Sequence, residues 1–292
     1  MEKAPLVALL TDFGTSDPFA GIMKGVIASI APGIQIVDLT HEIPPGDVQR
    51  GAVALWQAMM YFPPGTIFLG VVDPEVGTFR RPILVESENR TFIGPDNGLF
   101  SFVLGGDYQA WELRNPRLAL PSPGNTFHGR DIFAPAAAHA ASGIPGSEFG
   151  PAAAPLSRLP APLLDSSASQ MLRGEVLFPD RFGNLLTSLG RFVPLAGGTY
   201  ELQPWLRAGS ATNKAGQEKR LLRFHPAFTR LYLPGGESLQ WVTTFAKAPP
   251  GGCAFLVGSS GLLEIVAFQR SAAEILGLRS GNEITLRSLG EP

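Results

Sequence analysis

The sequence predicts an α/β N-terminal domain with a largely parallel sheet, followed by an all-β, barrel-like C-terminal domain. Strand-like and helix-like segments alternate through the first half, and short strand-like segments fill the second half. The stretch between them is rich in Pro, Ala, Gly and Ser, a composition typical of linkers. We expect the α/β domain over residues 1–150, a linker over 151–170 and the barrel over 171–292.

In the first half, apolar residues alternate between the spacing typical of strands and the spacing typical of helices. Asp47 is suited to cap the second of its helices, which the Pro-Pro-Gly sequence at 63–65 should end. Pro32 should end the first helix. Buried strands are expected over 6–12 and 66–73, an alternating strand over 34–40, and further strands over 81–87 and 90–94. Helices are expected over 19–32, 47–62 and 131–142, with a loop at 95–98. This order predicts a parallel sheet with helices on its faces.

The second half consists of short strand-like segments separated by turn residues. Strands are expected over 174–180, 199–205, 220–224, 230–236, 239–245, 253–259, 262–268 and 283–289. One short helix is expected over 270–277. Such a run of strands without long helices predicts a sandwich or a barrel.

Bulk composition excludes several classes of function. The net charge is −2 and no basic run occurs, so nucleic acid is disfavoured as a partner. No segment approaches the roughly 18 apolar residues that a membrane span needs. Cys253 is the single cysteine, which precludes an internal disulfide, and its apolar surroundings predict a core position. We therefore expect a soluble, cytoplasmic protein.

Familiar catalytic motifs are missing from the sequence. It contains no Walker loop, nucleophile elbow or Rossmann glycine fingerprint. The four histidines have no metal-ligand spacing, which leaves metal-dependent hydrolysis poorly supported. The histidines are His41, His128, His139 and His225.

Polar residues instead gather where predicted strands end, the edge at which open α/β sheets bind ligands. Asp12 follows the first strand and either accepts bonds from a ribose diol or caps the following turn. Asp73 follows the third strand and is either a site residue or, with Pro74, the start of a turn. His128 precedes a helix and is either a site residue or only a helix cap or packing residue. The other members of this group are Asp17, Arg80, Arg81, Arg130 and Asp131. Taken alone, these residues indicate a small-molecule site.

Several blocks of sequence together resemble one family. They are LTDFGTSDPFAGIMKG, DLTHEIPPGDVQRGA, VVDPEVGTFRRPI, IGPDNGLFS, TFHGRDIFAPAAA, DRFGNLLTS and GSSGLLEIVA. In this order, from residue 10 to about 267, they closely resemble the S-adenosylmethionine (SAM) hydroxide adenosyltransferases, water-using relatives of fluorinase and chlorinase. The resemblance implies hydrolysis of SAM, as substrate, to adenosine and methionine, with no metal or other cofactor. It also implies a homotrimer, with substrate held between the N-domain of one subunit and the C-domain of its neighbour.

The resemblance implies a catalytic set of Asp73, Arg80 and His128, in which Arg81 is an alternative to Arg80. Halogenating relatives carry a non-acidic residue at the position of Asp73, because an acid would repel a halide. We expect the set to hold one water in line with the ribose 5′ carbon and to accept its proton. Whether Asp73 or His128 accepts that proton stays open.

Substrate contacts follow from the resemblance position by position. Asp12 matches a residue that holds the ribose hydroxyls, Asp17 and Asp180 match acids near the methionine, and Ser259 and Ser260 match contacts to its carboxylate. Phe182, Asn184 and Phe245 match residues around the adenine, with a main-chain contact near Ala267. Thr126, Phe127 and Glu264 complete the expected site. The alternative is that both Phe182 and Phe245 are core residues and that Asp180–Asn184 is only a turn.

One segment departs from the family pattern. Phe268 and Arg270 stand where many relatives have Asn and Gly, which puts the turn after residue 267 in question. Two rival functions remain: a halide-using adenosyl transferase, and a non-catalytic sensor that binds SAM or adenosine. A methyltransferase is a weaker third possibility, because the glycine-rich loop common in that class is absent.

Overall fold

The computed structural model describes residues 6–166, 170–203, 205 and 222–289. The chain divides into two compact units, residues 1–159 and 160–292. Parts of two predicted strands, residue 204 of the segment 199–205 and residues 220–221 of the segment 220–224, lie outside the described residues.

A mostly parallel sheet forms the centre of the N-terminal unit, as predicted. Its strand order is β2-β1-β3-β5-β4-β6. Strands β1, β2, β3 and β5 run parallel, β4 is antiparallel to β5, and β6 is antiparallel to β4. The strands are β1 (Leu6–Thr11), β2 (Gln35–Thr40), β3 (Ile67–Val71), β4 (Pro82–Ser87), β5 (Arg90–Pro95) and β6 (Gln109–Glu112).

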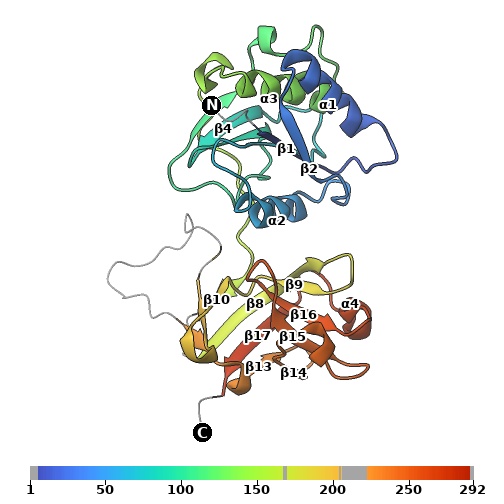
Figure 1. The fold of residues 1–292 in the computed structure, drawn as a ribbon, viewed down its shortest axis with the longest axis vertical. Coiled ribbons are helices and arrows are strands. Elements are labelled where there is room, and N and C mark those ends of the chain that lie inside the picture. The colour runs from blue at the N-terminus through green and yellow to red at the C-terminus, as the bar shows by residue number, and fades with distance from the viewer. Residues whose placement is uncertain (1–5, 167–169, 204, 206–221, 290–292) are drawn as a thin grey trace. The chain divides into compact units, whose positions relative to one another are not determined.

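Helices cover both faces of this sheet. Helices α1 (Phe19–Ile30) and α3 (Ala134–Ala141) lie on one face and α2 (Val48–Met59) on the other (Figure 1). Successive side chains of β1 therefore enter different cores: Val7 and Leu9 pack with α1 and α3, whereas Ala8 and Leu10 pack with α2. The Asp47 carboxylate accepts the N–H of Arg50 at 2.9 Å, which confirms the predicted cap of α2.

The third helix begins differently from the prediction. A π-helical turn, η2 (Gly129–Phe133), runs directly into α3. His128 precedes this turn, and π-turns are frequent at functional sites. Short 3₁₀ turns η1 (Pro116–Leu118) and η3 (Gly146–Glu148) follow the sheet and α3, respectively.

Residues 149–156 pack into the N-terminal unit in spite of their linker-like composition. Phe149, Ala153 and Leu156 are buried in its two cores. Ala152 forms an isolated β-bridge with Trp111 of β6.

The C-terminal unit is an antiparallel sheet that nearly closes into a barrel, which confirms the predicted class. Its main path is β14-β13-β17-β8-β9-β16-β15, and β7 pairs with β8. A bridge between Trp241 and Phe255 joins the two ends of this path. The strands are β7 (Leu164–Asp165), β8 (Met171–Pro179), β9 (Leu185–Thr187), β13 (Thr229–Tyr232), β14 (Ser238–Gln240), β15 (Cys253–Val257), β16 (Leu263–Ala267) and β17 (Glu283–Ser288).

A smaller sheet and several short helices complete this unit. The sheet contains β10 (Phe192–Pro194), β11 (Tyr200–Leu202) and β12 (Arg223–Phe224). The helices are η4 (Ala196–Gly198), η5 (Pro226–Phe228), η6 (Phe245–Lys247) and α4 (Ala272–Leu276), the last within the predicted segment 270–277. Cys253 is buried in the barrel core, as expected from its apolar surroundings.

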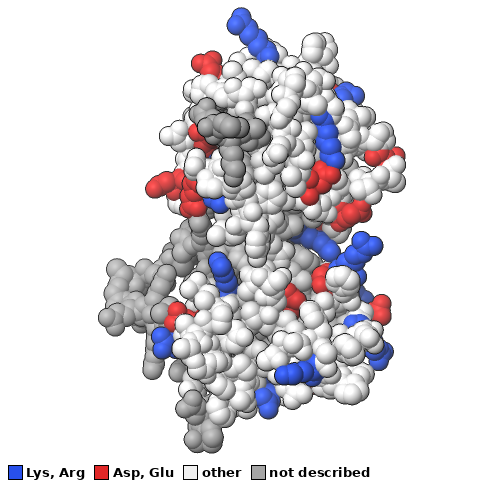
Figure 2. Space-filling view, viewed as in Figure 1, with Lys and Arg blue, Asp and Glu red and all other residues white. Residues whose placement is uncertain are grey.

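Charged side chains are scattered over the face shown in Figure 2, where neither sign forms an extended patch. Among the described residues, no helix is long and apolar enough to cross a membrane.

Candidate active site

The carboxyl ends of the parallel strands bring the predicted N-terminal site residues to one edge of the sheet. Asp12 directly follows β1, and Asp73 follows β3, which pairs with β1. The Asp12 carboxylate accepts the N–H of Gly46 at 2.8 Å. Burial raises the pKa of Asp12, the Gly46 N–H opposes that rise, and the nearby negative charge of Asp73 adds to it. The carboxylates of Asp12 and Asp73 are therefore close enough to influence each other electrostatically.

Asp73, Arg80 and His128 form one hydrogen-bonded set. Arg80 donates from Nε to one oxygen of Asp73 at 2.9 Å and from Nη2 to the other oxygen. The same Nη2 lies 2.8 Å from Nδ1 of His128. The side chains of Arg80 and Asp73 are only 4% and 5% exposed, so solvent screens this ion pair weakly. The structure thus brings together the three residues predicted to be catalytic.

The contact with Arg80 decides the state of the His128 ring. A guanidinium is a donor only, so Nδ1 of His128 must be the acceptor. In the neutral ring the proton therefore sits on Nε2. Burial lowers the pKa of His128, the positive charge of Arg80 lowers it further, and the negative charges of Asp73 and Asp131 oppose this without reversing it. His128 is consequently held as a neutral imidazole that presents an Nε2–H donor.

The guanidinium of Arg80 retains an unused donor. Among the described residues, its Nη1 is buried and has no hydrogen-bond partner. The guanidinium carbon lies 5.2 Å from the centre of the Phe133 ring. Unsatisfied buried donors are rare in folded proteins and are typical of functional sites.

The loop that carries Asp73 and Arg80 is shaped by Gly77 and Thr78. Gly77 has φ +81°, and a Cβ there would lie 2.7 Å from the carbonyl oxygen of Asn125. Only glycine allows this close approach to the segment that precedes His128. The Thr78 hydroxyl donates to the carbonyl of Glu75 at 2.8 Å and closes the turn.

Arg81 lies outside the set. Its Nε donates to Asp96 at 2.8 Å, and its Nη2 donates to the same carboxylate and to the carbonyl oxygen of Pro155. Of the two adjacent arginines, Arg80 is therefore the one that contacts Asp73 and His128.

An aromatic cluster lies beside His128. The rings of Phe13, Phe19 and Phe127 pack edge to face, with centroids 5.4 to 6.1 Å apart. The guanidinium carbon of Arg130 lies 5.3 Å from the centre of the Phe127 ring. Phe127 was predicted to be near the substrate, whereas Phe13 and Phe19 carry no sequence signal that would have singled them out. The predicted substrate contacts Asp17 and Thr126 are exposed.

In the C-terminal unit, Asp180 organises the turn that contains Phe182 and Asn184. Its carboxylate accepts the N–H groups of both residues at 2.8 and 2.9 Å, and the Asn184 side chain at 2.9 Å. Gly183 has φ +84°, and a Cβ there would lie 2.2 Å from Ser271. The segment therefore forms the expected turn, and Phe182 is not a core residue, since this ring is 78% exposed. Phe245 is also exposed, whereas Asn184 is buried.

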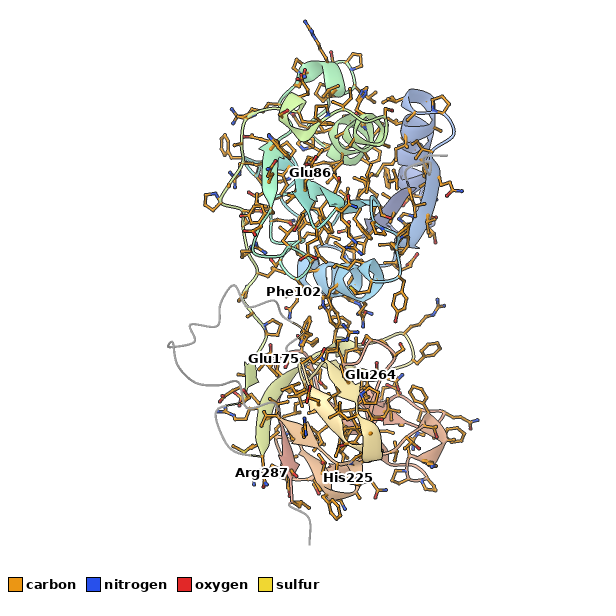
Figure 3. All side chains as sticks on the ribbon, turned by 60° about the vertical axis from the view of Figure 1, so that its left-hand side comes forward. Glu86, Phe102, Glu175, His225, Glu264 and Arg287 are labelled. Carbon is orange, nitrogen blue, oxygen red and sulfur yellow. The ribbon has the colours of Figure 1, made fainter. Side chains whose placement is uncertain are left out.

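Glu264 lies on β16 (Figure 3). Burial, followed by the negative charge of Asp180, raises the pKa of Glu264 to about 7. A Cβ at Gly258 would lie 1.8 Å from Glu264 Oε1, so the carboxyl lies directly over this glycine. Ser259 is exposed, and Ser260 Oγ is buried without a hydrogen-bond partner among the described residues.

The turn after Ala267 forms in spite of the unusual residues. Gln269 adopts a left-handed conformation with φ +55°, and the Ser271 hydroxyl caps α4 by accepting the N–H of Glu274 at 3.1 Å. Ala267 itself is buried in β16 and pairs with Cys253.

Among the residues that the structure describes, no three or more His, Cys, Asp or Glu side chains are grouped so that they could hold a metal ion.

Comparison with known proteins assigns both units to one family. The N-terminal domain of the SAM hydroxide adenosyltransferases matches residues 7–150, and their C-terminal domain matches residues 174–285. The chain belongs to the SAM hydroxide adenosyltransferase family. Its relatives include the (R)-S-adenosyl-L-methionine hydrolase of Thermus thermophilus, 40% identical over 96% of this chain and 98% of the relative.

Other known proteins are also similar to the chain. The (R)-S-adenosyl-L-methionine hydrolase of Salinispora arenicola is 36% identical over 97% of this chain and 98% of the relative. A fluorinase from an Actinoplanes species is 30% identical over 68% of this chain and 76% of the relative. A solved structure of an uncharacterized conserved protein from Thermotoga maritima has a TM-score of 0.78, at 30% identity over 96% of this chain and 99% of that one.

Proposed function

We propose that this SAM hydroxide adenosyltransferase hydrolyses (R)-S-adenosyl-L-methionine to adenosine and methionine by attack of water at the ribose 5′ carbon. Relatives named (R)-S-adenosyl-L-methionine hydrolase match nearly the whole chain, at 40% and 36% identity. The structural observation that carries the proposal is the buried hydrogen-bonded set of Asp73, Arg80 and His128.

The reaction needs a proton acceptor, and the contacts favour Asp73. As the water oxygen bonds to the 5′ carbon, the carbon–sulfur bond breaks and its electron pair goes to the sulfur of methionine. One proton of the water must leave at the same time. His128 uses Nδ1 to accept from Arg80 and presents a protonated Nε2, so it cannot also take this proton without losing the Arg80 contact. Each Asp73 oxygen keeps a free lone pair beside its bond to Arg80.

The other members of the set orient the water. His128 Nε2–H donates to the water oxygen, which leaves a lone pair of that oxygen for the attack. Arg80 fixes both the carboxylate and the imidazole through its guanidinium, and its positive charge stabilises the hydroxide character that develops. The leaving group is a neutral thioether, so no general acid is required.

The substrate contacts are proposed as the resemblance implies them. Asp12 holds the ribose hydroxyls, Thr126 and Phe127 line the reacting centre, and acids hold the methionine ammonium. The resemblance implies Asp17 and Asp180 for this role, and we add Glu264 because of its partly buried carboxyl. Ser259 and Ser260 bind the methionine carboxylate, while Phe182, Asn184, Phe245 and the main chain of Ala267 contact the adenine. Because the Asp180 carboxylate already accepts three N–H bonds within its own turn, we expect its contribution to substrate binding to be smaller than that of Glu264.

We also propose that the functional form is a homotrimer with substrate sites at subunit interfaces. Large apolar side chains that are exposed within their own units support a partner surface. Phe79, in the loop between Asp73 and Arg80, is fully exposed, and Phe182 is largely exposed. Light scattering on the purified protein tests this proposal, since a monomer at micromolar concentration would contradict it.

The activity is tested by incubating the purified protein with SAM in halide-free buffer that contains a metal chelator. Equimolar adenosine and methionine, formed from the (R) epimer and lost in Asp73→Asn, are the expected result. Addition of chloride or fluoride should yield no 5′-halogenated adenosine. Turnover that requires halide would identify a halogenase, and tight binding of SAM without turnover would identify a sensor.

A further inference from the structure

The loop after β5 holds both ends of the segment that carries Asp73 and Arg80. The side-chain amide of Asn97 donates to the carbonyl oxygen of Val72, the residue before Asp73, at 2.8 Å. The main-chain N–H of Asp96 donates to the carbonyl oxygen of Arg81, the residue after Arg80, at 2.9 Å. Two consecutive residues thus fix the main chain on either side of the catalytic segment.

The loop that carries Asn97 is itself firmly anchored. The Asp96 carboxylate is buried, accepts both contacts from the Arg81 guanidinium and accepts the N–H of Ser157 at 2.8 Å. Asn97 Oδ1 accepts the N–H of Leu99 at 3.2 Å, and the Leu99 side chain is fully buried in the core beneath β1 and β3. A loop fixed in this way can impose its position on its neighbours.

The hydrogen bond from Asn97 reaches the main chain just beyond the end of strand β3. Strand β3 ends at Val71, so Val72 and Asp73 lie beyond the last residue paired with β1. From Asp73 to Arg80 the chain forms an exposed loop, and the guanidinium must meet both carboxylate oxygens and His128. A small shift of the main chain at Val72 would be carried directly to the Asp73 carboxylate.

We propose that Asn97 is a positioning residue for the hydrolysis, acting through the main chain of Val72 to hold Asp73 in register with Arg80 and His128. The inference rests on the proposed function, since it assigns Asn97 to the water-attacking set. Displacement of a reacting group by about 1 Å can lower a rate about 100-fold. Asn97 therefore affects the chemical step and leaves substrate binding largely unchanged.

The chain offers a matched control in Asn115. Its side-chain amide donates to the carbonyl oxygen of Glu148 at 2.8 Å, and its Oδ1 accepts the N–H of Arg117 at 3.1 Å. Asn115 and Asn97 thus make the same two kinds of bond, and both are partly buried in the N-terminal unit. Only Asn97 is bonded to a residue adjacent to Asp73.

The test compares Asn97→Ala, Asn97→Asp and Asn115→Ala for kcat, KM and thermal midpoint. We expect Asn97→Ala to lower kcat roughly 10- to 100-fold with KM within about twofold, and Asn115→Ala to lower only the midpoint. Asn97→Asp should lose kcat at neutral pH and regain part of it, relative to wild type, at acidic pH, where the protonated acid again donates to Val72. Equal kcat losses in Asn97→Ala and Asn115→Ala, or a change confined to KM, would overturn the proposal.

A second measurement does not depend on turnover. In wild type, burial and the charge of Arg80 lower the pKa of His128, and NMR can follow this titration, with His128→Gln assigning the signal. We expect Asn97→Ala to move the pKa of His128 back toward its ordinary value, because the contact with Arg80 is loosened, and Asn115→Ala to leave it in place. An unchanged titration in Asn97→Ala would refute the positioning role. If wild type failed to hydrolyse SAM while this shift occurred, the proposed function would fail, and only the finding that Asn97 holds Asp73, Arg80 and His128 in register would stand.

Discussion

Arg80→Lys is the change that tests most directly whether the catalytic set works as a unit. Arg80 contacts three atoms, the two oxygens of Asp73 and Nδ1 of His128, from two different nitrogens. Lysine keeps the positive charge but carries a single nitrogen, which cannot occupy both positions. The substitution therefore retains the positive charge and removes the simultaneous hydrogen bonds to Asp73 and His128.

The magnitude follows from the bonds that are lost. We expect a lysine to retain one of the three contacts, so two hydrogen bonds to charged or strongly oriented groups disappear. Each is worth about 1.5–3 kcal/mol, which gives a total of about 3–6 kcal/mol. Because about 1.4 kcal/mol corresponds to a factor of ten in rate, the smaller figure already predicts a loss in kcat of about 100-fold. KM should stay within about threefold, since Arg80 contacts the set and not the bulk of the substrate.

The adjacent arginine provides the comparison. Arg81→Lys also loses paired contacts, those to Asp96 and to the Pro155 carbonyl, but these lie outside the set. We expect it to lower the thermal midpoint and to lower kcat by no more than about tenfold. The assay is steady-state release of adenosine, together with thermal unfolding of each variant. The reasoning would be refuted by an Arg80→Lys enzyme within tenfold of wild type, or by equal kcat losses in the two variants.

Three further predictions concern titration and packing. Protonation of His128 removes the lone pair that accepts from Arg80, so kcat should fall as pH drops through the lowered pKa of His128, and His128→Gln should abolish this acid limb of the pH profile. The pKa of Glu264 in the folded protein is raised to about 7, whereas an unfolded chain releases this proton near the ordinary glutamate pKa of about 4.3. Between these two pH values only the folded state holds the proton, so the free energy of unfolding should decline as pH rises from about 4.3 to about 7. Glu264→Gln should then raise the thermal midpoint at pH 8 by a few degrees, after allowance for solvent screening, and leave it nearly unchanged at pH 5, which calorimetry would show. Gly258→Ala places a Cβ against Glu264 Oε1 and should raise KM about tenfold with little change in kcat, whereas Gly252→Ala, where a Cβ makes only ordinary contacts, should change neither kinetic parameter.

Long, strongly patterned elements were predictable from the sequence, and short ones were not. The segments of β1, β3 and α2 have a clear period and clear end signals, so their class and limits were predicted within a few residues. The strands β9 and β10 contain only three residues each, too few to show a period, and no strand was predicted at β6. Their pairing is decided by neighbours distant in sequence, which local pattern does not record.

The site residues divide in a similar way. The rule that ligands bind at strand ends selected Asp12 and Asp73 from the sequence, because that rule depends only on where a strand stops. It could not distinguish Arg80 from Arg81, whose side chains leave adjacent positions of one loop toward different partners. Asn97 was not selected either, because its importance lies in a bond to a main-chain oxygen and not in its own chemistry.

The charges of the N-terminal site explain why water, and not an anion, suits it as the nucleophile. Arg80 neutralises Asp73 through paired hydrogen bonds, and His128 is held uncharged, so the set as a whole contributes no net positive charge. Burial raises the pKa of Asp12, and the negative charge of Asp73 adds to this rise, so Asp12 experiences the charge of Asp73 in spite of the pairing with Arg80. A negative potential attracts a sulfonium cation and opposes the entry of a halide. In the proposed mechanism, the arrangement that favours the charged substrate therefore also favours a neutral nucleophile, and Asp73 is the acceptor for the proton that the attacking water has to lose.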